Sequence, residues 1–164
     1  MVDPGPAGLT VDDLAQGWRE LGVEKGMALI VHASLSALGP VEGGAAAVVD
    51  SLRTAIGSAG TLVMPAFTPQ IADPDPTHVV SADASVRERR DAVATFDSDL
   101  PGRMGAVAEA LRSLPDSVRS THPQVSVAAV GAQAEFVVAH QTLGFALADP
   151  RRSVASTTLA ATSS

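Results

Sequence analysis

Hydrophobic and polar positions in the first half of the chain alternate with two different periods, which predict two helices and two strands. Thr10 and the two Asp residues after it mark a helix start, and the apolar positions that follow at a spacing of three and four share one helical face. Apolar runs at 27–31 and 61–64 predict strands buried on both faces. Between them, residues 45–56 return to helical spacing, which predicts a second helix.

A strand, a polar loop, a helix and a strand in this order predict a βαβ unit with two parallel strands and a right-handed crossover. Ligands of open parallel sheets bind beyond the carboxyl ends of the strands. The loop at 32–44 and the segment at 65–68 occupy such positions. We therefore expect the chemistry of this chain to lie there.

The second half of the chain is less regular. Residues 70–103 are rich in Asp and Arg with little periodicity, which predicts a long, irregular surface excursion of the kind that is usually functional or disordered. Helical spacing resumes at 104–114, an apolar run at 125–130 predicts a strand, and 132–140 a helix. The pattern predicts an α/β domain over 1–147 and a Ser/Thr/Ala-rich divergent tail over 148–164, too poor in large apolar residues to bury much.

Composition narrows the class of protein. With 164 residues, 46% hydrophobic and 18% charged, the chain fits one globular domain. It has no cysteine, and its four His residues follow no zinc-ligand spacing, so we expect no disulfide and no metal site. Neither a basic leader nor an apolar run of membrane-spanning length is present, which favours a cytoplasmic protein without a membrane partner.

The net charge of −7, with a single lysine, argues against a nucleic-acid partner, because phosphate backbones are held by clustered Lys and Arg. An acidic protein suits a cationic ligand, but acidity also serves solubility alone. Charge does not choose between these two readings, and the sequence leaves the oligomeric state open.

The first candidate site is the loop that runs from His32 to Gly39. It joins a strand end to a helix start, where polar side chains and backbone N–H groups can converge on a phosphate. It matches neither a P-loop nor a Gly-x-Gly-x-x-Gly turn. The alternative is that Ser34 and Ser36 cap a turn and His32 is a half-buried histidine with its polar atoms satisfied.

The second candidate site precedes the strand at 125–130. His122 can act as a base or a donor at neutral pH, and Arg119 can hold a phosphate or carboxylate through its planar fork. The alternative is that Arg119 pairs with Asp116 or Glu109 and that His122 packs against Pro123.

The third candidate is a group of carboxylates, Asp97 and Asp99 with Glu109, that could bind substrate ammonium groups. A solvated acidic loop is the alternative. A serine hydrolase built on Ser34 or Ser36 with His122 is disfavoured, because no Gly-x-Ser-x-Gly elbow surrounds either serine.

Taken in order, several segments resemble the aminoglycoside 3-N-acetyltransferase family. They are Val31-His32-Ala33-Ser34-Leu35-Ser36-Ala37-Leu38-Gly39, Gly60-Thr61-Leu62-Val63-Met64-Pro65-Ala66-Phe67-Thr68, Phe96-Asp97, Met104-Gly105-Ala106-Val107-Ala108-Glu109, and Arg119-Ser120-Thr121-His122-Pro123 followed by Ser126 and Gly131. The resemblance spans about residues 8 to 147. Each motif is moderately specific, and their shared order and spacing make a chance match improbable.

The resemblance implies an α/β fold with α/β/α layers and a mostly parallel sheet, unlike the GCN5-type acetyltransferases. It also implies acetyl-coenzyme A as co-substrate, an aminoglycoside or related amine as acceptor, acetylation of the 3-amino group, and hence antibiotic resistance. Carried over onto this sequence, the cofactor-binding residues are His32, Ser34, Leu35, Ser36 and Gly39, with Arg119 added from the second motif, and no metal is required.

The sequence departs from the family pattern at Ala148. Family members continue into a C-terminal region with a Thr-x-x-His-x-x-Glu-like motif that is implicated in deprotonating the amine. The resemblance thus implies a C-terminally truncated or altered chain with weakened or no turnover. His122 or His140 would be the replacement base, and His122 is the one we would test. The alternatives are a non-catalytic coenzyme A or nucleotide-binding domain, or a remnant that fails to fold.

Overall fold

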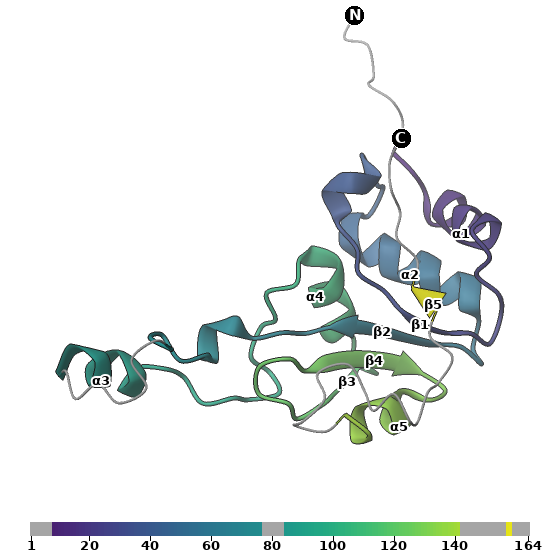
Figure 1. Ribbon diagram of the computed structural model, residues 1–164. Helices are drawn as coiled ribbons and strands as arrows, with labels where there is room; N and C mark the ends of the chain where they lie inside the picture. Colours follow the sequence, from purple (N-terminus) through teal and green to yellow (C-terminus); the bar gives the residue numbers. More distant parts are fainter. Residues whose placement is uncertain (1–7, 77–83, 142–156, 159–164) are drawn as a thin grey trace, which may run out of the picture.

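The protein folds into three layers, with a central sheet between helices on both faces (Figure 1). The structure is a computed structural model that describes residues 8–76, 84–141 and 157–158. Its helices are α1 (Val11–Glu20), α2 (Gly44–Ile56), α3 (Ala84–Asp91), α4 (Ala106–Arg112) and α5 (Ala134–Ala139), with short 3-10 turns η1 (Leu35–Leu38) and η2 (Pro69–Ile71). Its strands are β1 (Ala28–Ile30), β2 (Thr61–Pro65), β3 (Val118–Arg119), β4 (Val127–Gly131) and β5 (Thr157–Thr158).

The expected α/β/α class is confirmed, but the sheet is mixed rather than mostly parallel. In the order β3-β4-β2-β1-β5, β1 pairs in parallel with β2 and with β5, whereas β4 is antiparallel to both β2 and β3. The physical reason for the β3–β4 pairing is that a short loop, residues 120–126, joins the two strands and reverses the chain without a crossover helix. Because β3 has only two residues, no sequence pattern marked it.

The predicted βαβ unit is confirmed by β1, α2 and β2, whose strands pair in parallel from Ala28 with Thr61 to Ile30 with Val63. All five residues of β2 are buried, as the continuous apolar run predicted. Gly60 just before β2 lies so close to α2 that a Cβ there would be 2.5 Å from the Cβ of Ile56. Helix and strand therefore pack in near contact at this end of the unit.

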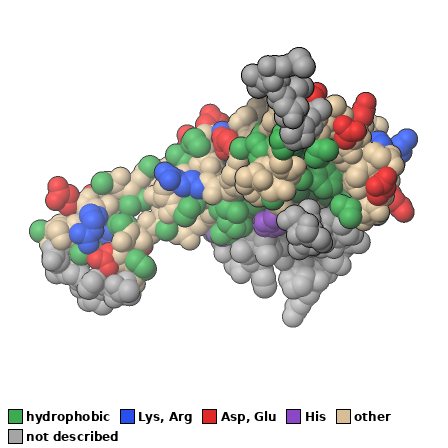
Figure 2. Space-filling view, turned by 90° about the horizontal axis from the view of Figure 1, so that it is seen from above, with side chains coloured by type: hydrophobic (Ala, Val, Ile, Leu, Met, Phe, Trp, Pro, Cys, Tyr) green, Lys and Arg blue, Asp and Glu red, His purple; other side chains and the backbone are tan. Residues whose placement is uncertain are grey.

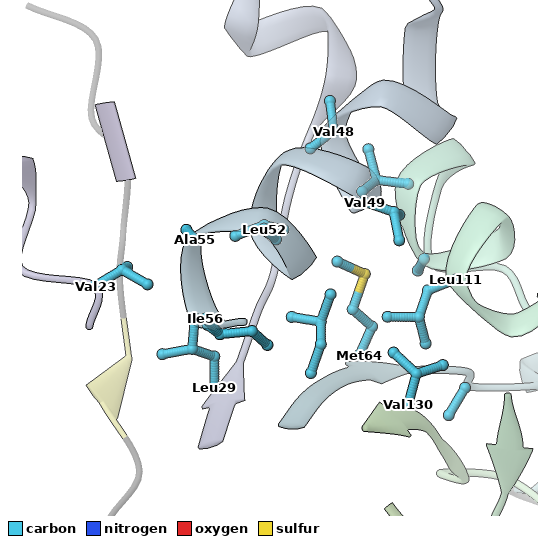
Figure 3. Close-up of a cluster of buried hydrophobic side chains, with 14 of the residues drawn as sticks. Val23, Leu29, Val48, Val49, Leu52, Ala55, Ile56, Met64, Leu111 and Val130 are labelled. Carbon is cyan, nitrogen blue, oxygen red and sulfur yellow. The ribbon is translucent and has the colours of Figure 1, made fainter. Parts of the chain in front are cut away.

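Side chains of the central strands alternate between the two helical layers, as the period of two in a strand requires. Leu62 and Met64 face the main core under α1, α2 and α4, together with Val130 of β4 (Figure 3). Val63 and Ala129 face the opposite side, in a smaller cluster that α5 covers. This alternation is what makes the fold three-layered.

Helix α1 begins as the sequence predicted. The Thr10 hydroxyl accepts from the Asp13 N–H at 3.2 Å, and the Asp13 carboxylate accepts from the Thr10 N–H at 3.0 Å, which together form a capping box. Further along α1, the indole N–H of Trp18 donates to the buried hydroxyl of Ser51 at 2.8 Å. This hydrogen bond ties α1 to α2.

The excursion after β2 differs from the irregular loop that was expected, since it contains helix α3, which extends away from the three layers (Figure 1). Two ion pairs hold α3 to the preceding segment, Arg89 with Asp75 at 2.9 Å and Arg90 with Asp73 at 3.0 Å. Helical apolar periodicity could not reveal α3, because Val86 is its one buried residue.

The tail also contributes to the sheet, where Thr157 pairs with Leu29 and Thr158 with Ile30. The division into a domain at 1–147 and a tail at 148–164 stays a prediction. Of the helices in the described ranges, none has both the length and the hydropathy needed to cross a bilayer.

Candidate functional site

Strands β1 and β2 end together, at Ile30 and Pro65, and we call this side of the sheet the carboxyl edge. A cavity of about 290 Å³ opens there. It is lined by Val31, His32, Ala33 and Ser34 after β1, by Pro65 of β2, and by Met104 and Ala108 at the start of α4. The cavity lies where the sequence predicted ligand binding, beyond the ends of two parallel strands.

The first predicted loop divides into residues that face solvent and residues that anchor it. His32, Ser34 and Ser36 are exposed, and the two serine hydroxyls lie 3.0 Å apart in a mutual hydrogen bond. Leu35 instead packs against the main core as the start of η1. Gly39 ends that turn with a φ of 76°, a conformation that side chains disfavour. His32 and Ser34 thus border the cavity, and Leu35 fixes the loop.

The loop leads into α2, a helix of 13 residues without a side-chain cap at its start. Gly43 and Gly44 both have positive φ, 81° and 61°, which lets the chain turn sharply into the helix. The first turn of α2 contains no acidic residue. Its N–H groups and its dipole are consequently compatible with an anion arriving from the loop side.

His122 lies in the turn between β3 and β4, where its Nδ1 atom accepts two backbone N–H groups, from Gln124 at 3.2 Å and from Val125 at 3.1 Å. An accepting Nδ1 carries no proton, so the neutral ring has its proton on Nε2. The ring therefore presents a donor to its surroundings. To act as a base through Nδ1, it would have to give up both hydrogen bonds, and the catalytic role of His122 stays a prediction.

Arg119 forms four hydrogen bonds that reach three separate segments of the chain. Because a guanidinium has five N–H donors, one of them has no acceptor among the residues that the structure describes. The alternative in which Arg119 pairs with Asp116 or Glu109 is wrong, since within the described residues Asp116 pairs with Arg53 and Glu109 with Arg112. The cofactor-binding role of Arg119 stays a prediction that competes with these internal contacts.

The three predicted substrate carboxylates have different surroundings. Asp97 and Asp99 are exposed, and an Asp97 carboxylate oxygen accepts the Asp99 N–H at 2.8 Å. Glu109 is instead held by Arg112 at 2.7 Å and by the Gly102 N–H at 3.2 Å. The hydrogen bonds from Arg112 lower the pKa of Glu109. Glu109 is ionised at neutral pH but already engaged.

Met104 and Ala108 also line the cavity, although neither was among the predicted site residues. The sequence pattern predicted a helix from Met104 on, but α4 begins at Ala106, so Met104 lies just before the helix and Ala108 lies in its first turn. Helical spacing therefore does not bring these two side chains together, and no sequence pattern indicated that both line the cavity.

A second, wider groove of about 700 Å³ lies at the other end of β2, around the ion pair of Arg53 and Asp116 and the backbone of Gly60. No sequence pattern indicated this groove, and none of the predicted site residues line it. On the face that Figure 2 shows, hydrophobic side chains gather in the middle, with the acidic ones mostly around the outline.

Three comparisons with known proteins agree. The family described as aminoglycoside 3-N-acetyltransferase matches residues 30–154. An aminoglycoside N(3)-acetyltransferase III of Serratia marcescens is 37% identical over 140 residues, which is 85% of this chain and 52% of the relative. The crystal structure of the aminoglycoside acetyltransferase AAC(3)-IIb superposes with a TM-score of 0.74 at 36% identity, over 87% of this chain and 52% of that one.

A further structure, of AAC-IIIb in a binary complex with CoASH, superposes with a TM-score of 0.70 at 30% identity, covering 84% of this chain and 51% of that one. The chain thus spans about half the length of the relatives it matches.

Proposed function

The chain belongs to the aminoglycoside 3-N-acetyltransferase family, and from this we propose that it binds acetyl-coenzyme A and transfers the acetyl group to the 3-amino group of an aminoglycoside. The observation that carries the proposal is the cavity at the carboxyl edge, bordered by the same loop, His32 to Gly39, that resembles the family's cofactor loop. Antibiotic resistance and a cytoplasmic location are parts of the same proposal.

In this proposal the cofactor loop and the start of α2 receive coenzyme A. The exposed hydroxyls of Ser34 and Ser36 and the ring of His32 offer hydrogen bonds, while the uncapped N–H groups of α2 favour its phosphates. Leu35 keeps the loop in place by packing on the core. Gly39 allows the chain to leave the loop with a positive φ.

The proposed acetyl transfer has two requirements, removal of a proton from the acceptor and attraction of that cationic acceptor to the site. The acceptor ammonium must first give a proton to a base, and the neutral nitrogen then attacks the thioester carbonyl to form a tetrahedral intermediate. Collapse of this intermediate breaks the C–S bond, and the departing thiolate takes up the second nitrogen proton, so that the amide and the free thiol are the products. Asp97, Asp99 and Glu109 supply negative charge that attracts a polycationic acceptor. His122 through Nε2–H is suited to donate a hydrogen bond rather than to remove the proton.

Calorimetry with coenzyme A tests the binding step. We expect one-to-one binding that weakens in His32→Ala and in Ser34→Ala. The matched control is Ser58→Ala, an exposed serine that lines the groove at the other end of the sheet. Equal affinity in all four proteins would move the cofactor site away from this loop.

Thiol release from acetyl-coenzyme A in the presence of gentamicin tests the transfer step. Turnover that disappears in His32→Ala but persists in Ser58→Ala supports the proposed enzyme. Binding of coenzyme A without any thiol release would instead favour a second function, that of a coenzyme A-binding domain without turnover. The observation favouring this second function is that Nδ1 of His122 already accepts two backbone N–H groups, so that this nitrogen is not available to take a proton from the acceptor.

A further inference from the structure

The acidic loop, residues 96–103, carries Asp97 and Asp99 along the carboxyl edge but has little hydrophobic anchorage of its own. Its residues are exposed or half-buried, and none belongs to the buried core. It nevertheless lies tightly against the end of β2, where a Cβ on Gly102 would come within 3.3 Å of the Ala66 backbone. Something other than hydrophobic burial therefore holds the loop in place.

Arg119 supplies that anchorage. One of its terminal nitrogens, Nη1, donates to the carbonyl oxygens of Ser98 at 2.8 Å and Leu100 at 2.5 Å, inside the acidic loop. The other, Nη2, donates to the Ala66 carbonyl at 2.7 Å, just beyond β2. Its carbon Cζ also lies 5.2 Å from the centre of the Phe96 ring, at the start of the loop, within cation–π range.

The fourth hydrogen bond fixes the guanidinium itself. Its Nε donates at 3.0 Å to the hydroxyl of Ser126, which is fully buried and in turn donates to the Ala66 carbonyl at 2.9 Å. One planar side chain therefore joins the acidic loop, the end of β2 and the start of β4. A lysine has a single ammonium in place of this fork and cannot reach all of these acceptors at once.

The charges around Arg119 fit the same role. Burial lowers the pKa of Arg119 and nearby Arg112 lowers it further, whereas Glu109, Asp97 and Asp99 raise it. Three carboxylates thus share the field of one half-buried cation. In the described part of the chain, neither Asp97 nor Asp99 forms an ion pair, and both side chains are exposed. They are therefore exposed negative charges on a loop whose backbone Arg119 holds.

We propose that Arg119 is a positioning residue, which holds the acidic loop in the conformation that presents Asp97 and Asp99 to the ammonium groups of a polycationic acceptor. The proposal rests on the proposed function for the identity of the acceptor. It differs from a role of Arg119 in binding the cofactor, because the guanidinium acts on the loop backbone.

Hydrogen exchange of the loop amides tests the positioning without any ligand. The N–H groups of Leu100 and Arg103 are bonded to the carbonyls of Asp97 and Phe67, so their protection reports on the loop. In Arg119→Lys we expect them to exchange on the order of tenfold faster or more, because charge-assisted hydrogen bonds are lost. Amides of β2 should keep their protection.

The matched control is Arg53→Lys, which alters a partly exposed arginine paired with Asp116 at the other end of the sheet. This variant should leave the exchange of the loop unchanged. If Arg119→Lys fails to fold, Phe96→Leu takes its place, since it removes the aromatic face beneath the guanidinium and keeps an apolar side chain. Unaltered loop exchange in a folded variant would overturn the proposal.

Calorimetry with gentamicin and with coenzyme A separates the possible roles. We expect Arg119→Lys to weaken gentamicin binding to the same degree as the double variant Asp97→Asn/Asp99→Asn, with coenzyme A affinity unchanged. Loss of coenzyme A affinity with intact loop exchange would assign Arg119 to the cofactor instead. If the unaltered protein binds no gentamicin, the proposed acceptor is wrong, while the exchange experiment still decides whether Arg119 holds the loop.

Discussion

Different kinds of interaction hold two regions of the molecule in place, the unit of β1, α2 and β2 and the excursion that follows it at residues 70–103. In the first, apolar side chains are buried between a helix and two strands, and all five residues of β2 are buried. In the second, ion pairs hold α3 and Arg119 holds the acidic loop, with Val86 as the one buried residue of its helix. Hydrophobic periodicity in the sequence indicates the region held by apolar burial, but it does not indicate the region held by ion pairs and hydrogen bonds.

The largest loss of stability should follow when a core side chain of the first region is truncated. Leu62 in β2 is fully buried, and we expect Leu62→Ala to lower the free energy of unfolding by about 2–5 kcal/mol, through lost transfer free energy and a residual cavity. Leu21→Ala, at a side chain 56% exposed, should change it by less than about 0.5 kcal/mol. Urea unfolding measures both, and similar costs would show that burial does not dominate this region.

A smaller and more local effect is expected where the second region is attached. Ser126 is buried and bridges Arg119 to the Ala66 carbonyl, so Ser126→Ala should cost about 1–3 kcal/mol by leaving polar groups unsatisfied. Its matched control is Ser113→Ala, at an exposed serine. Unlike Leu62→Ala, this change should raise hydrogen exchange mainly in the acidic loop. Equal exchange across the whole sheet would contradict the division into two regions.

How far the sequence could predict this molecule follows from the same contrast. The βαβ unit, α1, α4, α5 and the cavity-bordering loop were predictable, because their signals are local in the chain. The partners of Arg119 were not, since Ser98 and Ala66 are 21 and 53 residues away in sequence and offer only backbone carbonyls. Any residue type has such a carbonyl, so no pattern could reveal the contact.

A local polar contact, by comparison, can be predicted from sequence, and the capping box of α1 shows this. Thr10→Ala removes the hydroxyl that accepts the Asp13 N–H and should lower stability by about 0.5–2 kcal/mol. Thr54→Ala is the matched control, because Thr54 is exposed within α2 and has no capping role. Thermal unfolding distinguishes the two variants. A Thr10→Ala protein as stable as the control would mean that this cap contributes little to the fold.

The smallest expected effect concerns Glu109, where the two kinds of contact meet. Its partner Arg112 is three residues away on α4, whereas its second contact, the Gly102 N–H, belongs to the acidic loop. Hydrogen bonds from Arg112 lower the pKa of Glu109 in the folded protein below the ordinary value of 4.5. The ionised carboxylate therefore stabilises the fold fully above that pH, and this contribution is lost as the pH falls through the lowered pKa. Because the pair is partly exposed, it should stabilise the fold by as much as a helical surface pair does, about 0.2–0.5 kcal/mol.

Glu109→Gln removes this ionic contribution. The free energy of unfolding of the variant, measured in urea titrations, should therefore decrease less between neutral and acidic pH than that of the unaltered protein. If the contact with Gly102 also matters, the same variant should loosen the acidic loop in hydrogen exchange at neutral pH, where a helix-only role would leave that loop unchanged. An identical acid dependence in both proteins would show that Arg112 and Glu109 contribute no ionic stabilisation, and would leave Arg119 as the main attachment of the loop.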